Sequence, residues 1–250
     1  MKWLCWLCIF VSTIVQAKTE LTVLVGLDKP PYIILNDGSG YELDLLKLLT
    51  KKMGYEAVFL YVPNARIKDL MLEGKADIAT LQKPDPKLPL YYSQPYIRYQ
   101  NVAASLAGKS LQLEQMEQLR PYSVVAFHNA RALLDPDYKQ LTDQIINYQE
   151  VANQSQQLQM LMLERCDVVV MDRNIFYYYA KQAGHSMQLF DLAPVFQPSL
   201  YSAAFKNERL RGKFNKALAE VQQEPIFIQL QQKYFSQVNQ QLQSSPPQLP

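Results

Sequence analysis

Residues 21–62 have the sequence LTVLVGLDKPPYIILNDGSGYELDLLKLLTKKMGYEAVFLYV, in which β-rich and helical patterns alternate. The first β-rich run ends at Gly26, and leucines then recur at helical spacing over 41–53. A second β-rich run follows at 56–62. We expect the two strands to pair in parallel with a right-handed crossover, because antiparallel strands do not need an intervening helix. The stretch therefore predicts a βαβ unit and an α/β fold.

The alternation of strands and helices continues along the chain, and two extended runs enclose its second half. Extended runs at 101–106 and 200–206 enclose a second α/β region, in which strands are predicted at 122–127, 144–148 and 167–171. Two passages between α/β regions indicate two lobes joined by two crossover strands. The predicted units are lobe 1 at 18–105 and 200–235, lobe 2 at 106–199, and a disordered tail at 236–250, which is rich in Gln, Ser and Pro.

Residues 1–17 have the pattern of a secretory signal peptide. Lys2 supplies the charged end, the apolar run that follows is too short to anchor the chain, and Ala17 suits a signal peptidase. We expect cleavage after Ala17 and a periplasmic location. Cys5 and Cys8 each follow a leucine rather than the small residue of a lipoprotein signal.

Composition excludes several classes of protein. Without the signal peptide only Cys166 remains, so stability must come from a core, and the 48% hydrophobic content supplies one. Lys and Arg number 25 against 23 for Asp and Glu, and no basic cluster follows any segment, so we expect no nucleic-acid partner. No metal-ligand cluster, Ser-His-Asp spacing or phosphate-binding glycine loop is present, and we expect a monomer without cofactor.

Five segments together resemble a known family. They are 26–32, GYELDL at 40–45, LEGKAD at 72–77, YSQPY at 92–96 and RCDVVVMD at 165–172. Their order and spacing are similar to those of the family 3 extracellular solute-binding proteins, the periplasmic receptors of polar amino-acid ABC importers. The resemblance implies a type II two-lobed clamshell that closes on a small polar solute, an amino acid or related organic acid, and delivers it to an ABC permease.

Asp172 and Tyr32 are the first candidate ligand contacts. In relatives the aspartate that matches Asp172, at the carboxyl end of a buried strand, binds the ligand's ammonium. The alternative is an N-cap for a helix at 173–182. Relatives keep an aromatic residue at Tyr32 as a cleft wall, and core packing is the alternative there.

Relatives also imply a carboxylate clamp that this chain has changed. The segment after the strand supplies hydroxyl contacts, which assigns Thr80, and an arginine then grips the carboxylate, but Pro86 stands near that position here. Lys83 or Lys87 offers a point charge instead, unless both are solvated loop residues.

Three further cationic residues distinguish the predicted pocket from that of most relatives. Lys29 stands where relatives keep a stacking aromatic residue, and Arg131 follows a helix start where relatives have Gly-Thr. Arg66 belongs to a Pro-x-x-Arg motif that resembles a divergent branch of the family. Arg131 as a surface residue, and Arg66 as an ion pair with Asp69 or Glu73, are the alternatives. Convergence of Lys29, Arg66, Lys83 and Arg131 would suit an acidic solute.

Two other functions remain open at this stage. A free-standing receptor that signals through a membrane sensor would use the same ligand chemistry. A few relatives on this scaffold are dehydratases or parts of lyases, but the chain has only His128 and His185 as histidines and no recognised acid–base pattern. We therefore predict a binding protein rather than an enzyme.

Overall fold

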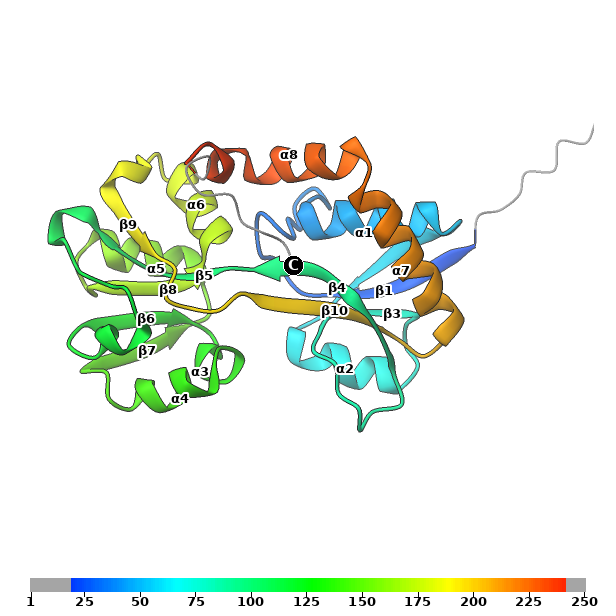
Figure 1. Ribbon diagram of the computed structural model, residues 1–250, viewed down its shortest axis with the longest axis horizontal. Helices are drawn as coiled ribbons and strands as arrows, with labels where there is room; N and C mark the ends of the chain where they lie inside the picture. The colour runs from blue at the N-terminus through cyan, green and yellow to red at the C-terminus, as the bar shows by residue number, and fades with distance from the viewer. Residues whose placement is uncertain (1–18, 242–250) are drawn as a thin grey trace, which may run out of the picture.

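The chain folds into two α/β lobes that lie side by side (Figure 1). The computed structural model describes residues 19–241, with side chains up to residue 235. In lobe 1 a five-stranded sheet has the order β2 (Glu56–Tyr61), β1 (Glu20–Val25), β3 (Ile78–Gln82), β10 (Ser199–Phe205), β4 (Tyr91–Tyr99). In lobe 2 the order is β7 (Asn147–Val151), β6 (Ser123–Phe127), β8 (Val168–Asp172), β5 (Asn101–Leu106), β9 (Phe190–Ala193).

Helices cover both sheets. In lobe 1 they are α1 (Tyr41–Lys52), α2 (Asn64–Leu72) and α7 (Glu208–Gln222). In lobe 2 they are α3 (Ala130–Leu133), α4 (Pro136–Thr142), α5 (Gln154–Met162) and α6 (Arg173–Gln182). The last helix, α8 (Pro225–Gln241), extends from lobe 1 to lobe 2. Among the described residues no helix has the length and apolar character needed to cross a membrane.

The βαβ unit is confirmed. β1 and β2 are parallel, with Leu21 opposite Ala57, and α1 connects them. Leu43, Leu46 and Leu49 of α1 are completely buried in the core. Burial of each such side chain contributes about 1.5–3 kcal/mol, which explains why the leucine spacing predicts this helix.

The two-lobed clamshell with two crossover strands is confirmed as well. β4 belongs to the first sheet and β5 to the second, and only Gln100 separates them in the chain. The return passage runs from β9 to β10. Carboxyl ends of the parallel strands β1, β3, β6 and β8 therefore point toward the junction of the lobes, where α/β sheets bind ligands.

Two local differences from the sequence predictions have clear causes. The strand predicted at 144–148 lies at Asn147–Val151, because Ile145 is a buried residue of the turn before it and Ile146 is exposed. Helix α4 was not predicted, although Asp135 accepts a hydrogen bond from the Asp137 N–H as its N-cap and proline occupies its first position.

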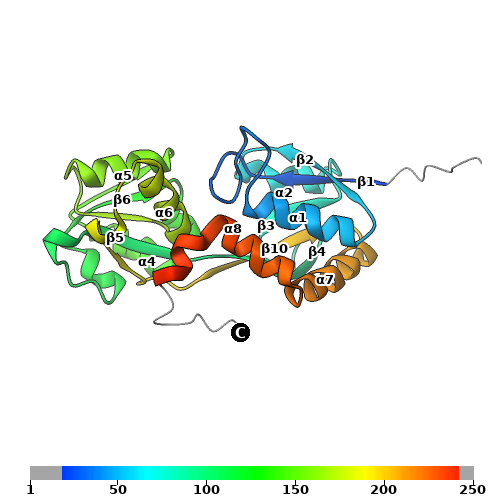
Figure 2. The same cartoon turned by 90° about the horizontal axis from the view of Figure 1, so that it is seen from above.

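The C-terminal helix joins the two lobes. It continues to Gln241 past a non-helical residue at Phe235, so the backbone of 236–241, assigned above to the tail, is helical. Asp44 of α1 holds it by accepting hydrogen bonds from Lys233 Nζ (2.8 Å) and Tyr234 Oη (2.6 Å). Its far end contacts α6 of lobe 2 (Figure 2). The predicted signal peptide and the tail beyond 241 lie outside the described residues.

Candidate ligand-binding cleft

Asp172 is buried at the carboxyl end of β8, where the lobes meet. Its Oδ1 accepts the backbone N–H groups of Asn174 (2.9 Å) and Ile175 (3.2 Å), so it is the N-cap of α6. Its Oδ2 accepts the N–H of Gln100, between the crossover strands, at 2.9 Å. The helix-cap alternative is thus observed, and the carboxylate is fixed beside the hinge.

Tyr32 connects the lobes through this carboxylate. It lies in lobe 1, 1% exposed, and its hydroxyl donates to Asp172 Oδ1 at 3.0 Å. Asn174 Nδ2 donates to the same hydroxyl at 2.8 Å. Burial raises the pKa of Asp172 to about 6, although the hydrogen bonds from Gln100 and Tyr32 act to lower it. Tyr32, which donates a hydrogen bond to Asp172, therefore belongs to the opposite lobe.

The backbone around Tyr32 is set by the start of α1. The N–H of Glu42 donates to the Tyr32 carbonyl oxygen at 3.0 Å, and Gly40 has φ +130°. A Cβ on Gly40 would lie 2.3 Å from that carbonyl oxygen, so only glycine fits this position. The GYELDL segment thereby holds Tyr32 in the junction.

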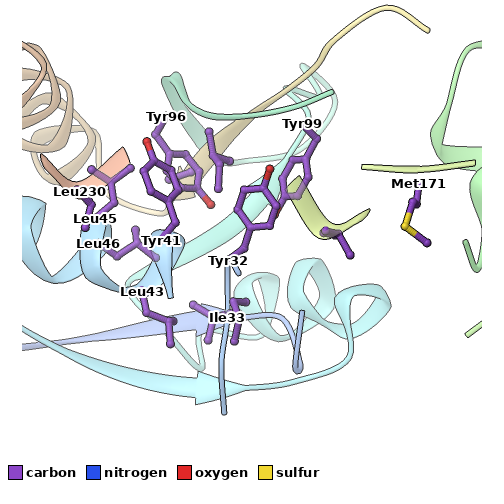
Figure 3. Packing of buried hydrophobic residues seen from close by; sticks show 14 of the residues in the cluster. Tyr32, Ile33, Tyr41, Leu43, Leu45, Leu46, Tyr96, Tyr99, Met171 and Leu230 are labelled. Carbon is purple, nitrogen blue, oxygen red and sulfur yellow. The ribbon is translucent and has the colours of Figure 1, made fainter. Parts of the chain in front are cut away.

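Three aromatic rings form a row along lobe 1, which we call the tyrosine row: Tyr32, Tyr99 and Tyr201. Figure 3 shows the rings of Tyr32 and Tyr99 next to each other. Their centroids are 4.4 Å apart, and those of Tyr99 and Tyr201 are 5.7 Å apart. Lys29 Nζ lies 4.5 Å from the Tyr99 centroid, and Lys83 Nζ lies 5.8 Å from the Tyr201 centroid. One ammonium group thus lies against the middle ring of the row, and the other lies near its last ring.

A buried carboxylate lies behind the tyrosine row. Glu42 is fully buried and accepts hydrogen bonds from Tyr96 Oη (2.5 Å) and, at the long limit of 3.5 Å, from Tyr99 Oη. Burial raises its pKa, while the charge of Lys29 acts in the opposite direction. The Thr80 hydroxyl is buried beside Glu42 and Tyr96, but Oγ1 is outside hydrogen-bonding geometry to either.

Lys29 interacts electrostatically with two buried carboxylates. Burial lowers its pKa, and the charges of Glu42 and Asp172 counteract this. Among the described side chains it makes no hydrogen bond or salt bridge, only its contacts with the rings of Tyr32 and Tyr99. The polar centre of the junction therefore contains two carboxylates and one ammonium.

Lys83 makes a second contact between the lobes. It lies after β3, and its Nζ donates to the carbonyl oxygen of Leu133 in α3 at 3.3 Å. The side chain is exposed, so the contact lies at the surface of the junction. The contacts between the lobes thus include a buried one, Tyr32–Asp172, and an exposed one, Lys83–Leu133.

The structure does not bring the four predicted cations together. Arg131 forms a salt bridge with Asp143 in lobe 2 (3.0 Å) and stacks on Tyr148, as its surface alternative implies. The backbone N–H of Arg131 donates to Glu150, so the start of α3 already binds a carboxylate of the chain. Arg66 is exposed on α2 and, within the described residues, pairs with neither Asp69 nor Glu73. Of these four cations, Lys29 and Lys83 are the two that lie against the tyrosine row.

Sequence reasoning missed several polar residues of this junction. Glu42 had a detectable signal, because it lies three, four and seven residues before Leu45, Leu46 and Leu49 and so on the apolar face of α1. Gln100, Asn174 and Tyr201 carried no such signal, since their places depend on how the lobes meet. No group of three His, Cys, Asp or Glu suited to a metal occurs in the part of the chain that the structure describes.

Comparisons with known proteins agree with this architecture. The model of the bacterial extracellular solute-binding proteins, family 3, matches residues 21–237. An ancestral arginine-binding protein bound to arginine is 23% identical, with a TM-score of 0.68 over 86% of this chain and 98% of that one. A substrate-binding protein of an ABC uptake transporter from Streptococcus pneumoniae with bound histidine is 17% identical, with a TM-score of 0.68 over 87% of this chain and 92% of that one.

A third similar structure is a histidine kinase sensor domain with similarity to periplasmic binding proteins. It is 16% identical, with a TM-score of 0.68 over 87% of this chain and 97% of that one. No curated protein matches the chain in sequence. Because these sequence identities are low, the solved structures show that the fold is shared and nothing further.

Proposed function

We propose that this chain, which belongs to the bacterial extracellular solute-binding proteins of family 3, captures a small organic acid between its lobes for an ABC importer. The supporting observation is the junction of the lobes, which are joined by two crossover strands and meet through Tyr32–Asp172 and Lys83–Leu133. Rigid lobes on two connections move about a hinge, and a ligand that contacts both favours the closed state. The proposed location is the periplasm, and the proposed state is a monomer.

The residues of the tyrosine row and its lysines carry the proposed binding. Tyr99 and Tyr201 offer flat apolar surface, while Lys29 supplies positive charge beside Tyr99 and Lys83 supplies it beside Tyr201. The buried hydroxyl of Thr80 is a further hydrogen-bonding group on this wall. A solute with a short carbon skeleton and one or two carboxylates matches this arrangement.

The burial of Asp172 and the hydrogen bonds that its carboxylate accepts favour an organic acid over a simple amino acid as the ligand. An ammonium group would need the carboxylate that Tyr32, Gln100, Asn174 and Ile175 already bind. Asp172 is only 3% exposed, so an amino acid has to move the Tyr32 hydroxyl aside to reach it, which leaves Asn174 Nδ2 without its partner at a cost of about 1–3 kcal/mol. An acid without an ammonium group avoids this cost. We propose no ligand contact for Arg66 or Arg131.

Lys83→Ala is expected to weaken solute binding at least about tenfold, equivalent to about 1.4 kcal/mol, without changing the stability of the free protein. A thermal-shift screen of the chain from Lys18 onward against organic acids, amino acids and polyamines identifies the solute, since a ligand that binds only the folded state raises the Tm. Calorimetry on the variant then gives the affinity.

Lys87→Ala is the matched control. Lys87 is an exposed lysine of the same loop, and within the described residues its side chain makes no ion pair or hydrogen bond. Equal losses of affinity in both variants contradict a specific role for Lys83. Absence of any stabilising solute across the organic acids contradicts the proposed ligand class.

The similarity to a histidine kinase sensor domain favours one alternative, a receptor that signals through a membrane partner. Ligand capture is the same in both cases, so the thermal-shift screen does not separate them. Co-purification of the ligand-bound protein with a permease supports the importer, and co-purification with a kinase supports the sensor.

A further inference from the structure

A pocket of about 390 Å³ lies where α6, α8 and the loop after β1 meet. Its walls come from lobe 1 through Pro31, from lobe 2 through Asn174, Tyr178 and Lys181, and from α8 through Tyr234 and Phe235. None of these residues belongs to the tyrosine row or to the lysines beside it. The pocket therefore adjoins the tyrosine row without containing any of its rings, and three distant segments of the chain build it.

The chemistry of the pocket is aromatic and positively charged. The rings of Tyr178, Tyr234 and Phe235 line it, and none of its lining residues is acidic. Lys233, on its rim, is paired with Asp44, whereas Lys181 has no acidic partner among the described side chains. Flat rings bind a planar group by stacking, and an unpaired ammonium binds an anion. We propose that this pocket is a second ligand site and that it takes a planar aromatic carboxylate.

Size agrees with this class of ligand. Pockets for small molecules commonly measure about 300–1,000 Å³, so 390 Å³ accommodates a one- or two-ring acid. The exposed position of Lys181 at the rim lets the carboxylate remain partly hydrated while the rings enter the apolar part. The charge of Lys181 thus selects the carboxylate end of the ligand, and the apolar part of the pocket selects its ring end.

The pocket is in contact with the residues that join the lobes. Asn174, in its lining, donates to the Tyr32 hydroxyl, which in turn donates to Asp172. Pro31, on the opposite wall, is the residue before Tyr32. A ligand that touches both walls binds best at the present angle between the lobes and so stabilises that angle. Given the proposed function, occupancy of this pocket is coupled to solute binding in the cleft through the angle between the lobes.

Indole-3-acetate is a suitable probe because it joins a planar ring system to a carboxylate. Calorimetric titration of the chain from Lys18 onward is expected to show saturable binding, and the neutral analogue indole-3-acetamide is expected to bind about tenfold more weakly. Lys181→Ala and Tyr178→Ala are each expected to weaken indole-3-acetate binding about tenfold. Both side chains lie at the surface of α6, so the variants are expected to fold.

Two controls separate this site from the cleft. Lys216→Ala, on α7 with a side chain 80% exposed, is expected to leave the affinity for indole-3-acetate unchanged. Lys83→Ala, in the cleft, is likewise expected to leave it unchanged. Absence of saturable binding overturns the proposal. Binding that depends on Lys83 and not on Lys181 also overturns it and assigns the probe to the cleft, so failure of this site is distinguishable from failure of the proposed function.

Discussion

Asp172→Ala is expected to lower the free energy of unfolding by about 3 kcal/mol at neutral pH. The substitution removes the N-cap of α6, which by itself contributes about 1 kcal/mol. It also leaves the Gln100 N–H and the Tyr32 hydroxyl, both held in the junction by this carboxylate, without their acceptor. Each unsatisfied buried donor costs about 1–3 kcal/mol, partly offset because the buried charge is removed as well. Urea denaturation measures the loss.

Asp143→Ala is the appropriate control for this experiment. Asp143 is also an aspartate of lobe 2, but its side chain is 71% exposed and pairs with Arg131 at the surface. Exposed ion pairs contribute about 0–1 kcal/mol, so its loss is expected to be small. Equal destabilisation by the two substitutions would show that the hydrogen bonds of Asp172 do not hold the lobe junction together.

The stability difference between the wild type and Asp172→Asn is expected to depend on pH. The pKa of Asp172 is raised from 3.8 to about 6, so the folded state binds this proton more tightly than the unfolded chain. The associated stabilisation is present below pH 3.8 and is lost as the pH rises through about 6. Asparagine cannot ionise and does not undergo this loss. The variant should therefore gain about 3 kcal/mol relative to the wild type across that interval.

Urea denaturation at about pH 4 and about pH 7 measures this effect. Taking the difference between the two proteins cancels the other carboxylates, including Glu42, whose pKa is also raised by burial. Asp143→Asn is the matched control, because this side chain is 71% exposed and an exposed ion pair contributes about 0–1 kcal/mol, so its stability difference from the wild type is expected to be small. Parallel stability curves for the wild type and Asp172→Asn would contradict a buried, ionisable Asp172.

Much of the architecture follows from local patterns. The leucines of α1 and the glycines at its two ends define one βαβ unit, and burial of those leucines makes the pattern decisive. The extended runs around Gln100 and before α7 show that the chain passes twice between lobes. β7 was misplaced because it is a polar strand at the edge of its sheet, while the more apolar Ile145 and Ile146 lie in the turn before it.

The site was less accessible to sequence reasoning. Tyr32 and Asp172 were named separately, and the structure places them in direct contact across 140 positions. Lys29 and Lys83 share the tyrosine row, whereas Arg131 pairs with Asp143 and Arg66 is exposed. Which cations converge depends on the relative placement of two lobes, and no local pattern contains that information. A resemblance to relatives supplies positions but not the hydrogen bonds that this chain makes with its own side chains.

Closure of the lobes on a solute is tested most directly by the distance between them. Lys68 on α2 and Lys139 on α4 are exposed residues of opposite lobes, and cysteines at these positions carry spin labels, while the native Cys166 is buried. Electron–electron resonance then measures the label separation with and without each solute that raises the Tm. We expect a broad distribution in the free protein and a single, shorter distance in the bound one. An identical distribution in both states would contradict solute-driven closure.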